Sequence, residues 1–175
     1  TYYLSDRINR RMNNGTVYHI ANRQTVAWGM KLLPGKKKTP SSHTFAFVGL
    51  MKPSQHIELI LKYIARNPSW DVKLIGISER NYYLKLIDII AHNSLEKRVW
   101  FPNQFIPEKQ LKKELVNCSI GLALYKTDKS QFTWYTDPGK IKTYFEFGLP
   151  VIMTNTSSMA KDIFKFHCGE VITNR

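Results

Sequence analysis

A regular alternation of short apolar segments with amphipathic segments begins at Thr44 and continues to the end of the 175-residue chain. The connections between the apolar segments are too long for hairpins, so consecutive strands are expected to run parallel, with helices crossing between them. The sequence therefore predicts an α/β fold, a doubly wound (Rossmann-like) parallel sheet of about six strands. The expected strands are 44–49, 71–76, 98–101, 118–125, 151–154 and 169–173.

Between these strands, apolar residues recur at three- and four-residue spacing, which is typical of helices with one buried face. The pattern is clearest over 57–64, behind Ser54, which we expect to cap that helix. Further helices are expected through Tyr82 to Ile90, from Pro107 to Leu115, and from Met159 to Phe166.

Residues 1–40 do not follow the alternation, and we predict that the α/β domain covers 41–175. The first segment is strongly basic, and the whole chain has 26 Lys and Arg against 13 Asp and Glu, a net charge of +13. Such a charge attracts polyanions, which include nucleic acid, anionic lipid head groups and phosphorylated small molecules. A solvated basic surface is the simpler alternative.

Composition excludes several other classes of protein. A hydrophobic content of 43% argues against disorder, and no apolar run approaches the roughly 20 residues of a membrane span. Cys118 and Cys168 are expected to be reduced and structural, as in a cytoplasmic protein. The five histidines lie too far apart for metal-ligand spacing, and no Gly-x-x-x-x-Gly-Lys-Ser/Thr phosphate loop is present.

The segment 137–152 combines a turn, a short helix and the start of a buried strand. Asp137 can cap the helix, Gly139 lets a ligand approach the backbone, and Lys140 can face an anion beside free amide donors. Gly148 is expected to end the helix. The alternative is an ordinary helix with good caps. For Asp137, a helix cap has stronger support than a contact with the ligand.

Several informative residues follow predicted strands directly. In a doubly wound sheet, the loops at the carboxyl ends of the strands converge on one edge, where ligands bind. We therefore expect a nucleotide-sized cleft there. Its candidate residues are Gly49, Gly76, Asn103, Phe105, Tyr125 and the turn at Asp137.

The segment from Phe45 to Ile172 resembles the C-terminal, nucleotide-sugar-binding domain of GT-B glycosyltransferases of the retaining family-four type (glycosyl transferases group 1). The matching pieces occur in the order of the family. They are Phe-Val-Gly49, Val-Lys-Leu-Ile-Gly76, Arg-Val-Trp-Phe101, Ser-Ile-Gly-Leu-Ala-Leu-Tyr125, and the block from Asp-Pro-Gly-Lys140 to Pro-Val-Ile152. The last two pieces in tandem are the most specific.

The resemblance implies a glycosyltransferase that moves a hexose from a nucleoside diphosphate sugar to a polysaccharide or lipid-linked acceptor. It implies no metal and no cofactor, and it places the catalytic residue in an N-terminal domain. Residues 1–40 would then be the tail of that domain and the linker, and 41–175 a donor-binding domain truncated at its C-terminus. By itself, such a fragment is expected to be inactive. A lipid-linked acceptor and the basic first segment suggest a cytoplasmic enzyme, peripheral at the anionic inner face of the membrane.

The sequence departs from the family at two glutamates, which are replaced here by Tyr135 and Thr143. The second glutamate binds the donor ribose in the family. Thr143 can still hydrogen-bond a ribose hydroxyl, although it lacks a carboxylate. Glu146 is an alternative one turn further on, but a solvent-facing position suits it better.

The diphosphate site also departs from the family, whose Arg and Lys are replaced by Leu50 and Gln55. Lys140 is the preferred replacement cation, with Lys52 and Lys142 as weaker candidates. Phe105 and Tyr125 are expected to flank the nucleobase, with core or rim packing as the alternative. The predicted donor-binding set is Gly49, Gly76, Phe105, Tyr125, Asp137, Gly139, Lys140 and Thr143.

Two other functions remain open from the sequence. The first is a basic α/β module that binds nucleic acid, motivated by the net charge and by four tryptophans, Trp28, Trp70, Trp100 and Trp134. The resemblance disfavours it, and the aromatic residues do not cluster with the basic ones. The second is a degenerate, non-catalytic domain that binds sugar nucleotides as a sensor or scaffold, motivated by the missing glutamate.

Overall fold

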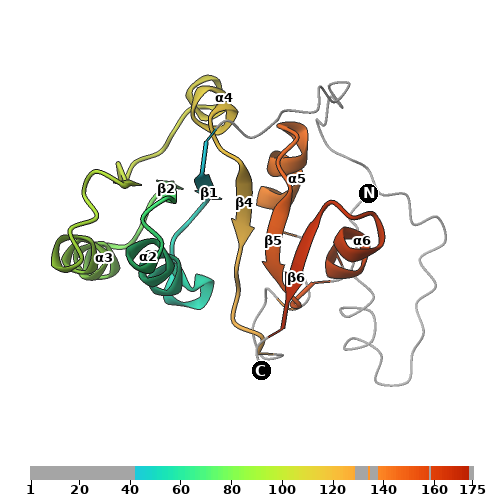
Figure 1. Cartoon of the computed structure of the whole chain (residues 1–175), viewed down its shortest axis with the longest axis horizontal. Helices are drawn as coiled ribbons and strands as arrows, with labels where there is room; N and C mark the ends of the chain where they lie inside the picture. Colours follow the sequence, from blue (N-terminus) through green and yellow to red (C-terminus); the bar gives the residue numbers. More distant parts are fainter. Residues whose placement is uncertain (1–41, 129–133, 135–137, 158, 174–175) are drawn as a thin grey trace.

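A computed structural model describes residues 42–128, 134, 138–157 and 159–173. Residues 1–40, for which a separate role was predicted, lie outside the described residues. The described part forms a parallel, six-stranded sheet in the order β3-β2-β1-β4-β5-β6 (Figure 1), which confirms the predicted doubly wound fold. The strands are β1 (Thr44–Val48), β2 (Asp71–Ile75), β3 (Val99–Trp100), β4 (Ile120–Ala123), β5 (Val151–Thr154) and β6 (Gly169–Ile172).

The helices follow the strands in alternation. They are the 3-10 turn η1 (Pro53–Gln55), α2 (Ile57–Arg66), α3 (Arg80–His92), α4 (Glu108–Val116), α5 (Gly139–Glu146) and α6 (Met159–Lys165). The buried faces of α2 and α3 pack on one side of the sheet, and those of α4, α5 and α6 pack on the other side. Each side of the sheet therefore has its own apolar core.

Strand alternation explains why one sequence supplies both cores. Successive side chains of a strand point to opposite faces of the sheet. Phe45 and Phe47 of β1 accordingly join the core under α2 and α3, while Ala46 joins the core under α4, α5 and α6. All three are almost fully buried.

The predicted N-terminal cap of α2 is wrong, whereas the predicted C-terminal end of α5 agrees with the structure. Ser54 does not cap α2, because it lies within η1. The N-cap of α2 is His56, which adopts the left-handed conformation (φ 53°) and forms no side-chain capping hydrogen bond. The predicted end of α5 is confirmed. Gly148 adopts φ 67°, and its N–H donates to the carbonyl of Phe145 at 3.0 Å.

Cys118 is buried and Cys168 is partly exposed, and the two cysteines form no disulfide bond with each other. Within the described ranges, no helix is long and apolar enough to cross a membrane.

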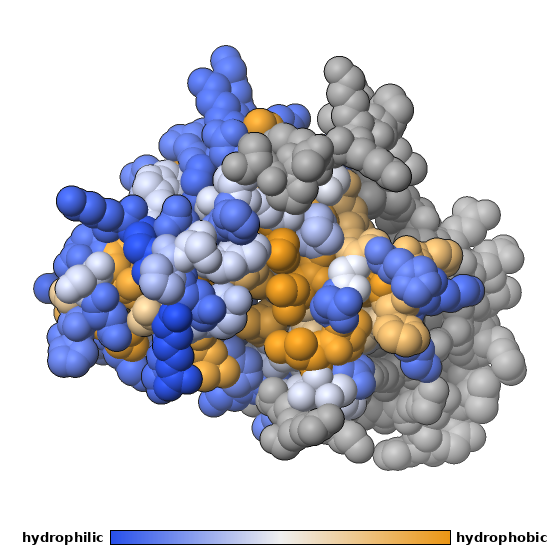
Figure 2. Space-filling view, in the orientation of Figure 1, coloured by the Kyte–Doolittle hydropathy of each residue, from blue (hydrophilic) through white to orange (hydrophobic). Residues whose placement is uncertain are grey.

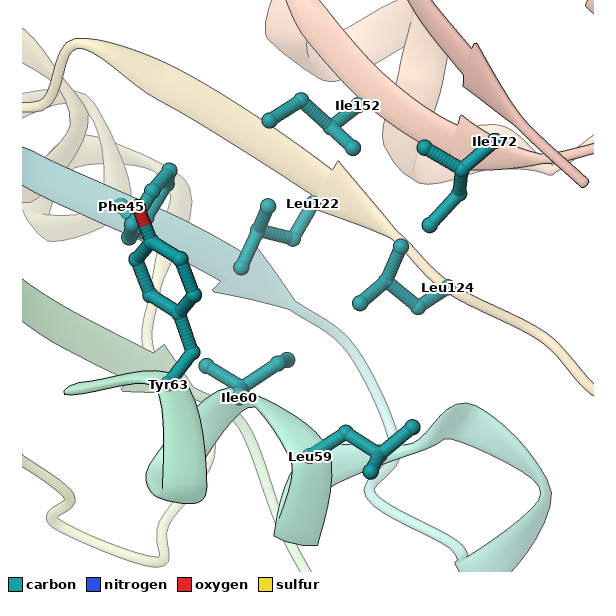
Figure 3. Close-up of a pocket in the computed structure, with 8 residues that line it drawn as sticks. All are labelled: Phe45, Leu59, Ile60, Tyr63, Leu122, Leu124, Ile152 and Ile172. Atoms are coloured by element: carbon teal, nitrogen blue, oxygen red, sulfur yellow. The ribbon is translucent and has the colours of Figure 1, made fainter. Parts of the chain in front are cut away.

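An apolar groove of about 320 Å³ lies on the sheet face that α2 and α3 share. Figure 2 shows apolar surface gathered in the middle of this view. The side chains that line the groove come from α2 and from β1, β4, β5 and β6 or the ends of these strands (Figure 3). The lining residues are Phe45, Leu59, Ile60, Tyr63, Leu122, Leu124, Ile152 and Ile172. None of them is charged, so this groove offers no cation for a phosphate.

Tyr144 of α5 joins the two central strands through its hydroxyl. The hydroxyl accepts a hydrogen bond from the N–H of Val48 at 2.9 Å and donates one to the carbonyl of Leu122 at 3.0 Å. Its ring is fully buried against Gly121, where a Cβ atom would lie 2.3 Å from two ring carbons. The absence of a side chain at Gly121 therefore lets α5 approach β4 closely.

Substitution of Tyr144 by phenylalanine is expected to lower the free energy of unfolding by about 2–4 kcal/mol, because a buried backbone N–H and a buried carbonyl each lose their partner. Urea denaturation measures the change. Tyr63→Phe is the control, since Tyr63 is 46% exposed, and its change should stay within about 0.5 kcal/mol. Equal losses in the two variants would contradict the bridging role of Tyr144.

Candidate functional site

Hydrogen bonds connect the loops that follow β1, β2 and β3 at the carboxyl edge of the sheet. The N–H of Gly49 donates to the carbonyl of Ile75 at 2.9 Å, and Met51 pairs with Ser78 in an isolated parallel bridge. The N–H of Ser78 in turn donates to Oδ1 of Asn103 at 2.7 Å. The three loops thus form one continuous rim, as the sequence predicted for this edge.

The loop after β4 continues this rim on the other side of β1. The N–H of Tyr125 donates to Oγ1 of Thr154 at 2.8 Å, at the end of β5. The N–H of Lys126 donates to the carbonyl of Ser54, in η1, at 2.9 Å. Hydrogen bonds therefore connect the ends of five strands, β1 to β5, along this edge.

Gly49 and Gly76, both predicted site residues, lie directly against each other. Both have positive φ angles, 120° and 146°, which residues with a Cβ atom rarely adopt. A Cβ atom at Gly76 would lie 2.1 Å from the carbonyl oxygen of Gly49. Both glycines are thus required for the chain path at this edge.

Lys140 reaches from the first turn of α5 to the turn at Gly49. Its Nζ donates a hydrogen bond to Oε1 of Gln55 at 2.6 Å and lies 3.7 Å from the ring centroid of Phe47. The ring centroid of Tyr125 is 5.2 Å from the same nitrogen. A Cβ atom at Gly49 would lie 3.7 Å from Cε of Lys140, so the ammonium group borders the open side of this glycine.

Burial of the amino group lowers the pKa of Lys140 from its usual 10.5 to about 7. The side chain as a whole is partly exposed. Within the described ranges Lys140 forms no ion pair, whereas Lys73 binds Glu114 at 2.7 Å and Lys85 binds Glu58 at 3.0 Å. An ammonium group that donates one hydrogen bond to a neutral acceptor has two further N–H donors and is suited to bind an anion.

From the sequence alone, Gln55 is only the residue that replaces a lysine of the family. The structure gives its side chain specific hydrogen-bond partners. Its Nε2 donates to the carbonyl of Leu50 at 2.8 Å, and this bond orients its Oε1 toward Lys140. Gln55 and Lys140 are 85 positions apart. The sequence around Gln55 carries no signal of this contact, and only the topology of the sheet brings the two side chains together.

The two predicted aromatic residues differ in their surroundings. Phe105 is 76% exposed in the loop after β3, where a flat ligand can reach its ring. Tyr125 is 4% exposed and packs in the core under α5. Burial raises the pKa of its hydroxyl, which therefore stays neutral. For Tyr125, the structure agrees with the alternative of core packing rather than with a position beside the nucleobase.

The remaining predicted residues lie along α5. Gly139 is exposed at the first position of the helix, and a Cβ atom there would meet nothing within 4 Å. Thr143 is partly exposed, with Oγ1 3.5 Å from the carbonyl oxygen of Gly139. Asp137 lies outside the described residues.

No contact between Lys140 and the alternative site residues is seen among the described residues. Lys52 is exposed, and Lys142 is partly exposed. The pKa of Lys112 in α4 is raised mainly by its hydrogen bond to Glu108, with a smaller contribution from the charge of Glu146. Glu146 therefore lies on the side of α5 near α4. Among the described residues, no three His, Cys, Asp or Glu side chains lie where they could hold a metal ion.

No protein-family model matches the sequence, and no curated protein matches it. Solved glycosyltransferase structures share its fold. The lipopolysaccharide outer core galactosyltransferase WaaB superposes with a TM-score of 0.64 at 19% identity, over 97% of this chain and 47% of WaaB. The C-terminal domain of the group 1 glycosyl transferase LpcC from Francisella tularensis gives 0.59 at 15% identity, over 90% of this chain and 77% of the domain.

A third similar structure is HepE of Anabaena in complex with UDP-glucose, with a TM-score of 0.55 at 17% identity, over 69% of this chain. This chain spans 32% of the length of HepE and less than half of WaaB. The comparisons show that the fold is that of the C-terminal half of GT-B glycosyltransferases.

Proposed function

We propose that this chain is the donor-binding part of a glycosyltransferase that uses a nucleoside diphosphate sugar. The observation that carries the proposal is the ammonium group of Lys140, which borders the turn at Gly49 without an anionic partner among the described residues. The shared fold supports it, because HepE, which has the same fold, was crystallised with UDP-glucose.

The chemistry of this site follows from charge. In the transfer, the bond between the anomeric carbon and the diphosphate oxygen breaks, and negative charge grows on the leaving diphosphate. A cation placed beside that oxygen stabilises the transition state more than the ground state. Lys140 supplies the cation, and the amino-terminal end of α5 adds its helix dipole. The share of this domain in catalysis is therefore positioning and electrostatic stabilisation.

The finer assignment rests on the resemblance and on charge. We assign hexose transfer, of the retaining family-four type, to a polysaccharide or lipid-linked acceptor, with the catalytic residue in an N-terminal domain that residues 1–40 would join to this one. The net charge of +13 favours a cytoplasmic enzyme that is peripheral at the anionic inner face of a membrane. Phe105 and Thr143 are assigned to the nucleobase and the ribose, and Asp137 and Gly139 to the turn that faces the diphosphate.

Calorimetric titration of this chain with UDP, GDP and ADP, each compared with its nucleoside, tests the proposal. At least one diphosphate should bind about tenfold or more tightly than its nucleoside, because charge-assisted contacts to the phosphates add to base contacts. No sugar transfer by this chain is expected, because the proposal assigns the acceptor site and the catalytic residue to an N-terminal domain. Robust transfer by this chain alone would contradict the division into domains.

Short duplex DNA and anionic vesicles at matched, near-physiological salt are the controls for unspecific charge attraction. If duplex DNA binds at submicromolar concentration and none of the diphosphates is preferred over its nucleoside, the basic nucleic-acid-binding module is the better interpretation. Diphosphate binding without transfer in a protein that includes the N-terminal domain would instead favour the sensor or scaffold.

A further inference from the structure

We propose that Gln55 is a positioning residue for Lys140, which holds the ammonium nitrogen at the Gly49 turn through a neutral acceptor and so leaves the charge available for the diphosphate of the ligand. The inference rests on the proposed function for the identity of the ligand. It rests on geometry for the role of Gln55, which forms hydrogen bonds to both Lys140 and the backbone of Leu50.

A carboxylate at position 55 would hold Lys140 equally well but would neutralise it. The carboxamide oxygen accepts a hydrogen bond from either the ammonium or the neutral amine, because both have N–H donors. The bond of 2.6 Å can therefore persist while the charge of the nitrogen changes. The orientation of the amide is fixed, because the carbonyl of Leu50 can only accept and thus requires the NH2 group of Gln55 on its side.

The groups around Lys140 favour a change in charge when an anion binds. Phe47 and Tyr125 enclose the nitrogen, and the hydroxyl of Tyr125 stays neutral because burial raises its pKa. Burial, together with the charge of Lys126, lowers the pKa of His56, which follows Gln55 in the chain, so His56 adds no charge at neutral pH. Since Lys140 itself has a pKa of about 7, a bound diphosphate should raise that pKa and draw one proton into the site.

The sign of the pH dependence follows. Below pH 7 Lys140 is already charged, and the affinity for the diphosphate is highest. As the pH rises above 7, Lys140 loses its proton in the free protein. The affinity then falls by up to about tenfold per pH unit, until the pH reaches the pKa of Lys140 in the bound state. A sugar nucleotide is the right probe, because its diphosphate is esterified at both ends and has no proton that titrates near pH 6.

The first measurement uses no ligand. In a 13C-lysine-labelled sample, the Cε signal of Lys140, assigned with Lys140→Arg, should titrate near pH 7 in the natural chain and at least one pH unit higher in Gln55→Glu. The matched control is Gln110→Glu on α4, which adds the same charge on a different helix and should leave the midpoint unchanged. An ordinary lysine midpoint near 10.4 in the natural chain, or no shift in Gln55→Glu, would overturn the inference.

The second measurement titrates UDP-glucose, GDP-mannose and ADP-glucose at pH 6.5, 7.5 and 8.5. For the sugar nucleotide that binds most tightly, Gln55→Glu should weaken binding at least tenfold at pH 6.5 and remove most of the pH dependence, with Gln110→Glu unchanged. Gln55→Met, which keeps the volume but offers only a weak acceptor, should weaken binding two- to fivefold and keep the pH dependence.

The outcomes separate the two proposals. A Lys140 midpoint that shifts as expected, in a protein that binds none of the three sugar nucleotides, supports the role of Gln55 in holding Lys140 and contradicts the proposed function. Sugar-nucleotide binding that is the same in Gln55→Glu and the natural chain supports the proposed function and overturns the role of Gln55.

Discussion

Substitution of Lys140 by alanine is expected to weaken the binding of a nucleoside diphosphate about ten- to hundredfold, which corresponds to a loss of about 1.5–3 kcal/mol. The amino group borders Gly49 and has only a neutral side-chain acceptor among the described residues, so a bound diphosphate would be its main anionic partner. Binding of the corresponding nucleoside should change little, because it lacks the phosphates. Isothermal titration calorimetry with both ligands measures the difference.

Lys142→Ala is the matched control, since it removes the same type of side chain from the same helix, at a position that is partly exposed. Its effect on diphosphate binding should stay below about threefold. If Lys140→Ala weakens the nucleoside and the diphosphate equally, Lys140 has a structural role only. If both lysine variants weaken the diphosphate equally, general charge attraction explains the binding.

Substitution of Gly76 by alanine is expected to lower the free energy of unfolding by about 2–5 kcal/mol. The new Cβ atom would lie 2.1 Å from the carbonyl oxygen of Gly49, and φ at this position is 146°. The strained φ angle costs roughly 1–3 kcal/mol, and the displaced backbone costs a similar amount. Because Gly49 must move, diphosphate binding should also weaken in whatever protein remains folded. Urea denaturation and calorimetry measure the two effects.

Gly139→Ala is the matched glycine control. A Cβ atom there meets nothing within 4 Å, and the residue begins α5, so the free energy of unfolding should stay unchanged or rise by up to about 1 kcal/mol. A loss as large as that of Gly76→Ala would contradict the steric explanation. Weaker diphosphate binding in a fully stable Gly139→Ala would instead support the predicted close approach of the ligand to this turn.

The sheet could be predicted from the sequence because its signals are local and repeated. Most strands are short apolar runs, and each helix from α2 to α6 has apolar residues at helical spacing, so errors at single boundaries did not change the order of elements. Ser54 shows the limit of such signals. It has the residue type of a helix cap, but the chain forms a 3-10 turn there and places His56 at the start of α2.

The candidate site was predictable in part. Gly49, Gly76 and Lys140 were expected at the carboxyl edge from the topology, and the structure brings these three together. The contacts of Gln55 and Tyr144 were not predicted, because each joins residues that are distant in the chain. Such contacts depend on the register and spacing of the strands, which a single sequence does not reveal.

The most direct test of the central claim is a crystal structure of this chain with the sugar nucleotide that binds most tightly. We expect a diphosphate oxygen within about 3 Å of Nζ of Lys140, beside the turn at Gly49, and the base on the side of Phe105. A diphosphate bound elsewhere on the molecule, with Lys140 still in contact only with Gln55 and Phe47, would contradict the assignment of this edge as the donor site.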